Sequence, residues 1–197
     1  MRGVASVAIL AVSLASGCLG TSPTPRFYAL QPIETEQVPA SDLALAVGPL
    51  HLPRYLQNPQ IVTRKGDSEV EYEQLHRWAG SLESQTLRVI GENLANLLGT
   101  ERVIVYPLAG PFPLKYRVRL DVERFDAQQG VAVELRVRWV IVDAASGDVL
   151  AVDLTSLRSP LGSKRVVDLV DAQGQALGAL SREIAARIRE LESGAQP

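Results

Sequence analysis

Alternation of apolar and charged residues between positions 131 and 142 constrains the fold more than any other feature of the chain. The large apolar residues occupy every second place, at Val131, Val133, Leu135, Val137, Trp139 and Ile141. Three of the intervening residues are charged: Glu134, Arg136 and Arg138. A period of two is typical of a β-strand that has one face on a hydrophobic core and the other in water. The sequence therefore predicts a strand with Trp139 inward, in a sheet covered on one side.

The same alternation extends the sheet into a meander and sets an expected register. The accompanying strands are expected at residues 102–106, 115–125 and 149–157. Keeping the apolar positions on one face places Asp121 across from Arg136, and Arg138 across from Asp153. Opposite charges at such positions contribute about 0.2–1 kcal/mol each. The arginines could also form a site for an anionic ligand, but their matching acids favour an ordinary solvated sheet face.

Two segments carry apolar residues at helical spacing. The first covers residues 81–98, with Ser81 as its N-cap and Gly99 after its last turn. The second covers residues 168–192, where Gly174 and Gly178 predict close packing against the sheet. Their apolar stripes are Leu87, Ile90, Leu94 and Leu97 in the first, and Leu177, Leu180, Ile184, Ile188 and Leu191 in the second.

Shorter strands complete the expected fold. They are predicted at residues 27–30, 43–47, 60–64 and 69–73, and the alternation of Leu43, Leu45 and Val47 indicates a half-buried strand. The resulting order of strands, helix, strands and helix is typical of an α+β layer architecture. We expect a small two-layer α/β sandwich whose mostly antiparallel sheet has two long helices packed on it.

The only cysteine of the chain, Cys18, lies shortly after an apolar run near the N-terminus. Arg2 precedes an apolar run at residues 4–14, which is too short for a bilayer span of about 20 residues but typical of a signal peptide. Residues 14–18, LASGC, resemble the bacterial lipobox, in which the cysteine is acylated and becomes the first mature residue. Ala15 departs from the usual Leu. The alternative is an ordinary secreted protein with a stray cysteine.

These features predict a layout of three parts. We expect a lipoprotein signal peptide at residues 1–17, a lipidated tether at 18–26 and one α+β domain at 27–193. Two or more acyl chains anchor a protein stably. Leu19 follows the cysteine where an Asp would retain a lipoprotein in the inner membrane. By resemblance to enterobacterial sorting, the expected location is the periplasmic face of the outer membrane, with the inner membrane as the alternative.

The inventory of reactive side chains argues against an enzyme. The only histidines are His51 and His76, and their spacing does not suit a metal site. The sequence lacks the glycine-rich phosphate loops and the nucleophile elbow. We therefore expect no catalytic residue, no cofactor and no metal. A net charge of −2 without a basic cluster also argues against a nucleic-acid partner.

Four short segments, in this order, resemble the ABC-type transport auxiliary lipoproteins of the PqiC/YmbA group. They are YAL at residues 28–30, LQNPQIVTR at 56–64, RWAGSL at 77–82 and LSREIA at 180–185. Gly80-Ser81 departs from the acidic residue and Pro that are more common in the family. The resemblance implies a periplasmic component of an MCE-type system, which moves lipids between the two bacterial membranes. It also implies that the lipoprotein docks with the MCE-domain protein.

The candidate partner-binding residues are Arg54, Tyr55, Arg77 and Trp78. Arginine and aromatic side chains are enriched where partners bind most strongly. A role in the core is the favoured alternative for Trp78, and it stays open for Arg54 and Tyr55. The expected partners are an MCE-domain protein and the membrane that holds Cys18, and a homo-oligomer is left open. A second function class, an envelope assembly lipoprotein such as a pilotin or an outer-membrane machinery subunit, fits the same layout.

Overall fold

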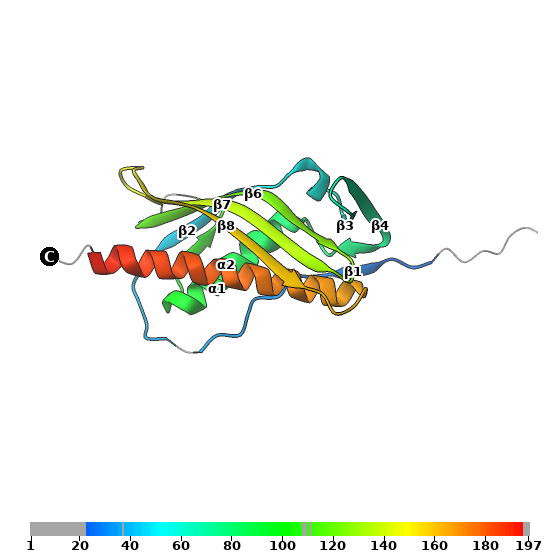
Figure 1. The fold of residues 1–197 in the computed structure, drawn as a ribbon. Helices are drawn as coiled ribbons and strands as arrows, with labels where there is room; N and C mark the ends of the chain where they lie inside the picture. Colours follow the sequence, from blue (N-terminus) through cyan, green and yellow to red (C-terminus); the bar gives the residue numbers. More distant parts are fainter. Residues whose placement is uncertain (1–22, 37, 108–109, 111, 195–197) are drawn as a thin grey trace, which may run out of the picture.

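The computed structural model describes residues 23–36, 38–107, 110 and 112–194, which form two layers. Helices α1 (Leu82–Leu98) and α2 (Val166–Gly194) lie together on one face of an eight-stranded sheet (Figure 1). This is the α+β architecture that the sequence predicts. The strands are β1 (Arg26–Tyr28), β2 (Leu45–His51), β3 (Gln60–Lys65), β4 (Glu69–Trp78), β5 (Val103–Val105), β6 (Tyr116–Gln128), β7 (Ala132–Asp143) and β8 (Val149–Pro160).

Strand β6 is the centre of the sheet. It pairs along its length with β7 in antiparallel order, and β7 pairs with β8 in the same way. On its other side, β6 pairs in parallel with β2 and then with β3. The short strands β1 and β5 add parallel pairs to β4 and β2. The sheet is therefore mixed, although its two longest ladders are antiparallel.

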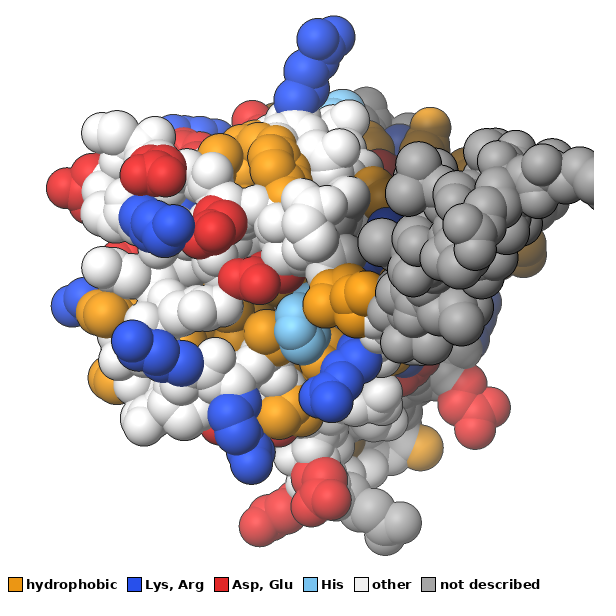
Figure 2. Space-filling model, turned by 90° about the vertical axis from the view of Figure 1, so that its right-hand side faces the viewer, with side chains coloured by type: hydrophobic (Ala, Val, Ile, Leu, Met, Phe, Trp, Pro, Cys, Tyr) orange, Lys and Arg blue, Asp and Glu red, His pale blue; other side chains and the backbone are white. Residues whose placement is uncertain are grey.

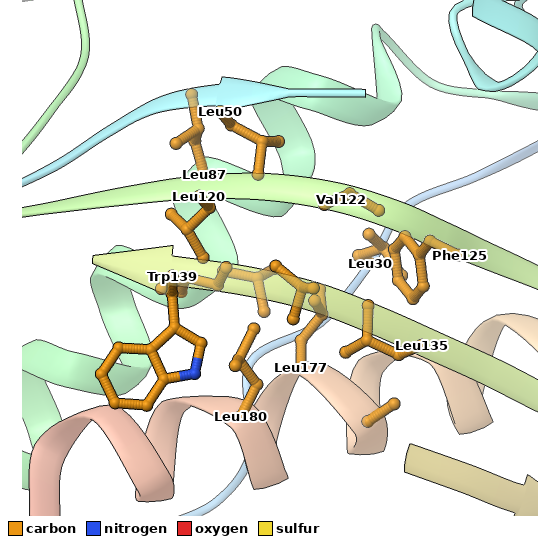
Figure 3. Close-up of a cluster of buried hydrophobic side chains, with 14 of the residues drawn as sticks. Leu30, Leu50, Leu87, Leu120, Val122, Phe125, Leu135, Trp139, Leu177 and Leu180 are labelled. Atoms are coloured by element: carbon orange, nitrogen blue, oxygen red, sulfur yellow. The ribbon is translucent and has the colours of Figure 1, made fainter. Parts of the chain in front are cut away.

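The faces of β7 agree with the predicted alternation. Trp139 is 2% exposed and points toward α2, whereas Arg136 and Arg138 lie on the solvent side. Side chains of β6 and β7 meet Leu177 and Leu180 of α2 in the same core (Figure 3). The exception is Val131, which is 41% exposed because it precedes the strand, in the turn from β6.

The predicted pairing of Asp121 with Arg136 is wrong by two residues. Asp121 lies across from Arg138, because the hairpin turn is centred on Gly130, which has a φ of 70°. A three-residue turn of this kind favours glycine at the left-handed position. A bulge between Val122 and Arg124 then shifts the ladder back by one residue. The total shift is even, so the faces are retained.

The predicted pairing of Arg138 with Asp153 is wrong by one residue. A register shift between Ile141 and Val142 brings Asp153 opposite Trp139 instead. Both arginines pair with Glu123 instead, which accepts from Arg136 at 2.6 Å and from Arg138 at 3.4 Å. The hydrogen bond from Arg136 lowers the pKa of Glu123.

Strand β2 differs from the half-buried strand that the sequence predicts. Leu45, Ala46 and Val47 are all buried, so both faces of this strand are covered. Its place between β5 and β6, with parallel partners on both sides, explains this. Strand β4 also extends further than predicted and ends at Trp78.

The helices begin and end close to the predicted positions. The Ser81 hydroxyl accepts from the amide of Ser84, and Gly99 follows the last turn of α1. The expected packing of Gly174 and Gly178 against the sheet is wrong. A side chain at either position would meet Gln31 or Ile33, in the segment that follows β1.

This N-terminal segment fills the groove between the two helices. The amide of Leu30 donates to Gln85 Oε1 at 2.8 Å, and that of Ile33 donates to Asn93 Oδ1 at 3.0 Å. Asn93 also donates to Ser181 of α2. Because these buried side chains satisfy the backbone of the segment, it packs as part of the core.

We predict that Gly178→Ala destabilises the domain, although alanine is the better helix former. The new Cβ would lie 2.3 Å from Ile33 Cγ2, and overpacking of this kind costs about 1–3 kcal/mol. Chemical denaturation measures the loss. In the Gly178→Ala/Ile33→Ala double variant, the loss in the free energy of unfolding should be smaller than the sum of the two single losses. A loss equal to that sum would contradict the contact.

Candidate functional site

The predicted recognition loop forms a short 3-10 helix, η1 (Arg54–Leu56), on the face of the sheet away from α1 and α2. Leu56 is buried and fixes the loop from below. Gln57 Nε2 donates to the Leu52 carbonyl at 2.9 Å, and Asn58 Nδ2 donates to the Tyr55 carbonyl at 3.3 Å. These bonds hold the backbone in one conformation. The Arg54 side chain is exposed and makes no ion pair within the described residues.

The Tyr55 side chain reaches a fully buried carboxylate, that of Asp126 on β6. Its hydroxyl donates to Asp126 Oδ2 at 2.7 Å. Arg64 Nε on β3 and Arg124 Nε on β6 donate to Asp126 Oδ1 at 2.8 and 3.0 Å. Asp126 is 0% exposed, so its charge depends on these three donors. We refer to these four residues as the Asp126 cluster.

The electrostatics of the Asp126 cluster keep Tyr55 in its neutral form. Burial raises the pKa of Tyr55 to about 12, and the hydrogen bond to Asp126 adds to this rise. The guanidinium of Arg64 lies over the Tyr55 ring, 5.4 Å from its centre. Tyr55 is therefore a hydrogen-bond donor that attaches η1 to the sheet.

Ion pairs extend from the Asp126 cluster across the outer face of the sheet. Arg124 Nη1 contacts Glu134 on β7 at 2.6 Å, and Arg158 on β8 contacts the same carboxylate at 3.5 Å. Arg124 also lines a hollow of about 300 Å³ between β6, β7 and β8. The arginines here are paired with acids, which agrees with the solvated-face interpretation of the sequence.

The second candidate pair lies next to the end of the loop. The amide of Trp78 donates to the Pro59 carbonyl at 2.8 Å, and Arg77 lies opposite Gln60 in the ladder. The structure therefore places the two predicted clusters next to each other in space, although they are separated in the sequence. Trp78 is 4% exposed and belongs to the core, whereas Arg77 is half-buried. Of the four candidates, Arg54 is the one whose side chain is exposed.

The other predicted positions lie apart from this surface. Cys18 is outside the described residues. His51 is exposed at the end of β2, and His76 Nδ1 is 2.7 Å from the Tyr28 hydroxyl. The described part of the chain holds no group of three or more His, Cys, Asp or Glu residues arranged for a metal ion. It also contains no helix that is long and apolar enough to cross a membrane.

The sequence patterns do not identify Asp126 and Arg64 as members of a site. Asp126 follows directly after the predicted strand at 115–125, where a carboxylate is expected in a solvated turn. The flanking residues Phe125 and Ala127 give no signal of burial, because an acid between two apolar residues fits a strand with one solvated face. The arginine that meets it is 62 residues away, so no local pattern identifies the pair.

We predict that Tyr55→Phe lowers the free energy of unfolding by about 1–3 kcal/mol, because a buried carboxylate loses a donor. Chemical denaturation measures this loss. Tyr72→Phe is the matched control, because the Tyr72 hydroxyl makes no hydrogen bond within the described residues. An equally small effect of both substitutions would contradict the assignment of Tyr55.

Two solved structures show the same fold. One is a crystal structure of an uncharacterised protein, with 20% identity and a TM-score of 0.69, covering 84% of this chain and 99% of that one. The other is protein XCC0632 from Xanthomonas campestris, with 17% identity and a TM-score of 0.72, covering 87% of this chain and 99% of that one. No curated protein sequence matches significantly.

The family comparison agrees with the fold. Residues 28–185 match the family described as the ABC-type transport auxiliary lipoprotein component. This match runs from β1 into α2 and includes η1, the Asp126 cluster, the apolar stripe of α1 and that of α2 as far as Ile184. The chain therefore belongs to the ABC-type transport auxiliary lipoprotein component family.

Proposed function

We propose that this protein is a docking subunit of an MCE-type lipid transport system, anchored through Cys18 on the periplasmic face of the outer membrane. Membership of the auxiliary lipoprotein family supports a role beside a transporter, carried out by binding and without turnover. The observation that carries the proposal is the exposed Arg54, presented on a loop whose backbone is fixed from several sides.

A fixed loop is suited to binding because little conformational freedom is lost when a partner arrives. Tyr55 attaches the loop to Asp126, and Leu56 packs into the core beneath it. Pro59 joins the other end of the loop to β4 through the Trp78 amide. Arg54 is left free to pair with an acidic group of the MCE-domain protein. Arginine is among the residues that contribute most at protein interfaces.

The lipid anchor complements this surface. A tethered domain samples a thin layer beside the membrane, which raises the effective concentration of the partner site. A contact of modest affinity is therefore enough for docking.

We predict that Arg54→Glu reduces co-purification of the MCE-domain protein by about tenfold or more, the effect of losing one strong interface contact. Stability should change by less than about 0.5 kcal/mol, because Arg54 is exposed and unpaired within the described residues. The measurement is capture of the partner by the full-length lipoprotein from solubilised membranes, with denaturation of each variant in parallel.

Arg182→Glu is the matched control for this experiment. Arg182 is an exposed arginine of α2 that forms no ion pair in the described part of the chain. Its reversal changes the net charge equally but on the other layer of the molecule. Full capture by Arg54→Glu, or equal losses in both variants, would rule out the η1 surface. Reproducible capture of secretion or assembly machinery in place of an MCE-domain protein would favour an envelope assembly lipoprotein.

A further inference from the structure

One end of the molecule carries an unusual set of exposed groups around the start of β1. Strand β1 runs beside the end of β4, with Arg26 opposite His76 and Phe27 opposite Arg77. The turn before β7 and the first turn of α2 reach the same end (Figure 1). A Cβ atom on Gly130 would lie 3.1 Å from Lys164 Cγ. The turn before β7 is therefore close to the segment that leads into α2. We call this surface the tether end, because the predicted tether leads directly into it.

A hollow of about 320 Å³ opens on the tether end. The Tyr28 hydroxyl and His76 Nδ1, which are 2.7 Å apart, form part of its wall. Figure 2 faces this end and shows basic and hydrophobic side chains beside a histidine. The hollow is lined by Arg26, Tyr28, Glu73, His76, Gln129, Lys164, Arg165, Val166 and Val167.

The charges that line the hollow favour an anion. Neither Arg26 nor Lys164 forms an ion pair within the described residues, and both side chains are exposed. Arg165 adds a third cation, which pairs with Asp168 at 2.6 Å. The single lining carboxylate, Glu73, already accepts from Gln129 at 2.6 Å and from Thr63 at 3.2 Å. Two cations are therefore available to an incoming phosphate.

Exposed apolar side chains also lie at the tether end, and one of them, Val167, lines the hollow. Phe27 is 64% exposed, Val167 42%, Val131 41% and Leu75 39%. Phe27 adjoins Arg26, Val131 adjoins Gly130, and Val167 lines the hollow itself. Apolar groups interspersed with Lys and Arg are typical of surfaces that settle into the headgroup region of a bilayer. A protein partner would account for the apolar groups, but the tether favours a lipid surface.

We infer that the tether end rests on an anionic phospholipid surface, with a lipid phosphate in the hollow between Arg26 and Lys164. This inference rests on the proposed anchoring through Cys18. The nine residues from Cys18 to Arg26, eight steps along the chain, span roughly 27 Å at full extension, so the anchor keeps the tether end close to the headgroups. Contact would orient the domain, leaving η1 and the outer face of the sheet accessible to a partner.

The single cysteine of the chain makes this contact measurable. Because Cys18 is acylated in the anchored protein, Val167→Cys or Val131→Cys introduces one reactive thiol for a fluorescent probe. Val149→Cys is the control, since Val149 is an even more exposed valine, at 59%, next to the turn at residues 143–148, at the other end of β8. The labelled full-length lipoprotein is reconstituted in nanodiscs of phosphatidylcholine, with or without phosphatidylglycerol, that contain headgroup-level quencher lipids.

We expect quenching at positions 167 and 131 in the discs that contain phosphatidylglycerol, and little at position 149. Removing two cations, in Arg26→Gln/Lys164→Gln, should lower the ratio of contacting to free protein by roughly fivefold per charge. The Arg119→Gln/Arg182→Gln variant removes two exposed arginines elsewhere that form no ion pair among the described residues. It should leave the contact unchanged.

Several results would overturn the inference. Absent quenching, equal quenching at all three positions, or equal losses in both double variants would exclude this contact. A response of the Val167 probe to inorganic phosphate that matches its response to lipid would assign the hollow to free phosphate. Mass analysis of the N-terminal peptide is made on the same samples. An unmodified Cys18 would count against the proposed anchoring itself, whereas acylated protein without quenching refutes the membrane contact alone.

Discussion

A buried carboxylate, that of Asp126, holds the outer layer of the molecule in place. A charge in a site without solvent is stable only when it is paired, and removing one partner of such a pair costs about 3–5 kcal/mol. The donors to Asp126 come from η1, β3 and β6, so one residue of β6 holds two elements whose donors lie 71 and 62 residues earlier in the chain. The surface that presents Arg54 therefore depends on this cluster as well as on the hydrogen bonds of the loop backbone.

The other layer depends on the segment after β1. Leu30 and Ile33 enter the groove between α1 and α2, where Gln85 and Asn93 accept from their backbone amides. The predicted tether therefore leads into a strand and then directly into the core. In consequence, the segment after β1, the helices and the sheet form one packed body, and a fixed tether end would set the direction in which η1 points.

Sequence patterns predicted the features that depend on residues close together in the chain. The alternation around Trp139 and the cap at Ser81 gave the correct faces and helix start, because both depend on neighbouring residues. The registers of Asp121 and Asp153 were wrong, because the positions of a bulge and of the turn at Gly130 are decided by the partner strand. The role of Tyr55 was equally hidden, since Asp126 is 71 residues away.

The loop fixed by Asp126 is the proposed docking surface for the MCE-domain protein. Hydrogen–deuterium exchange of the full-length lipoprotein, with and without the purified MCE-domain protein, tests it most directly. The account predicts that the partner slows exchange at residues 53–60 and in the adjoining end of β4. Slowed exchange confined to the exposed face of α2, with residues 53–60 unchanged, would contradict it.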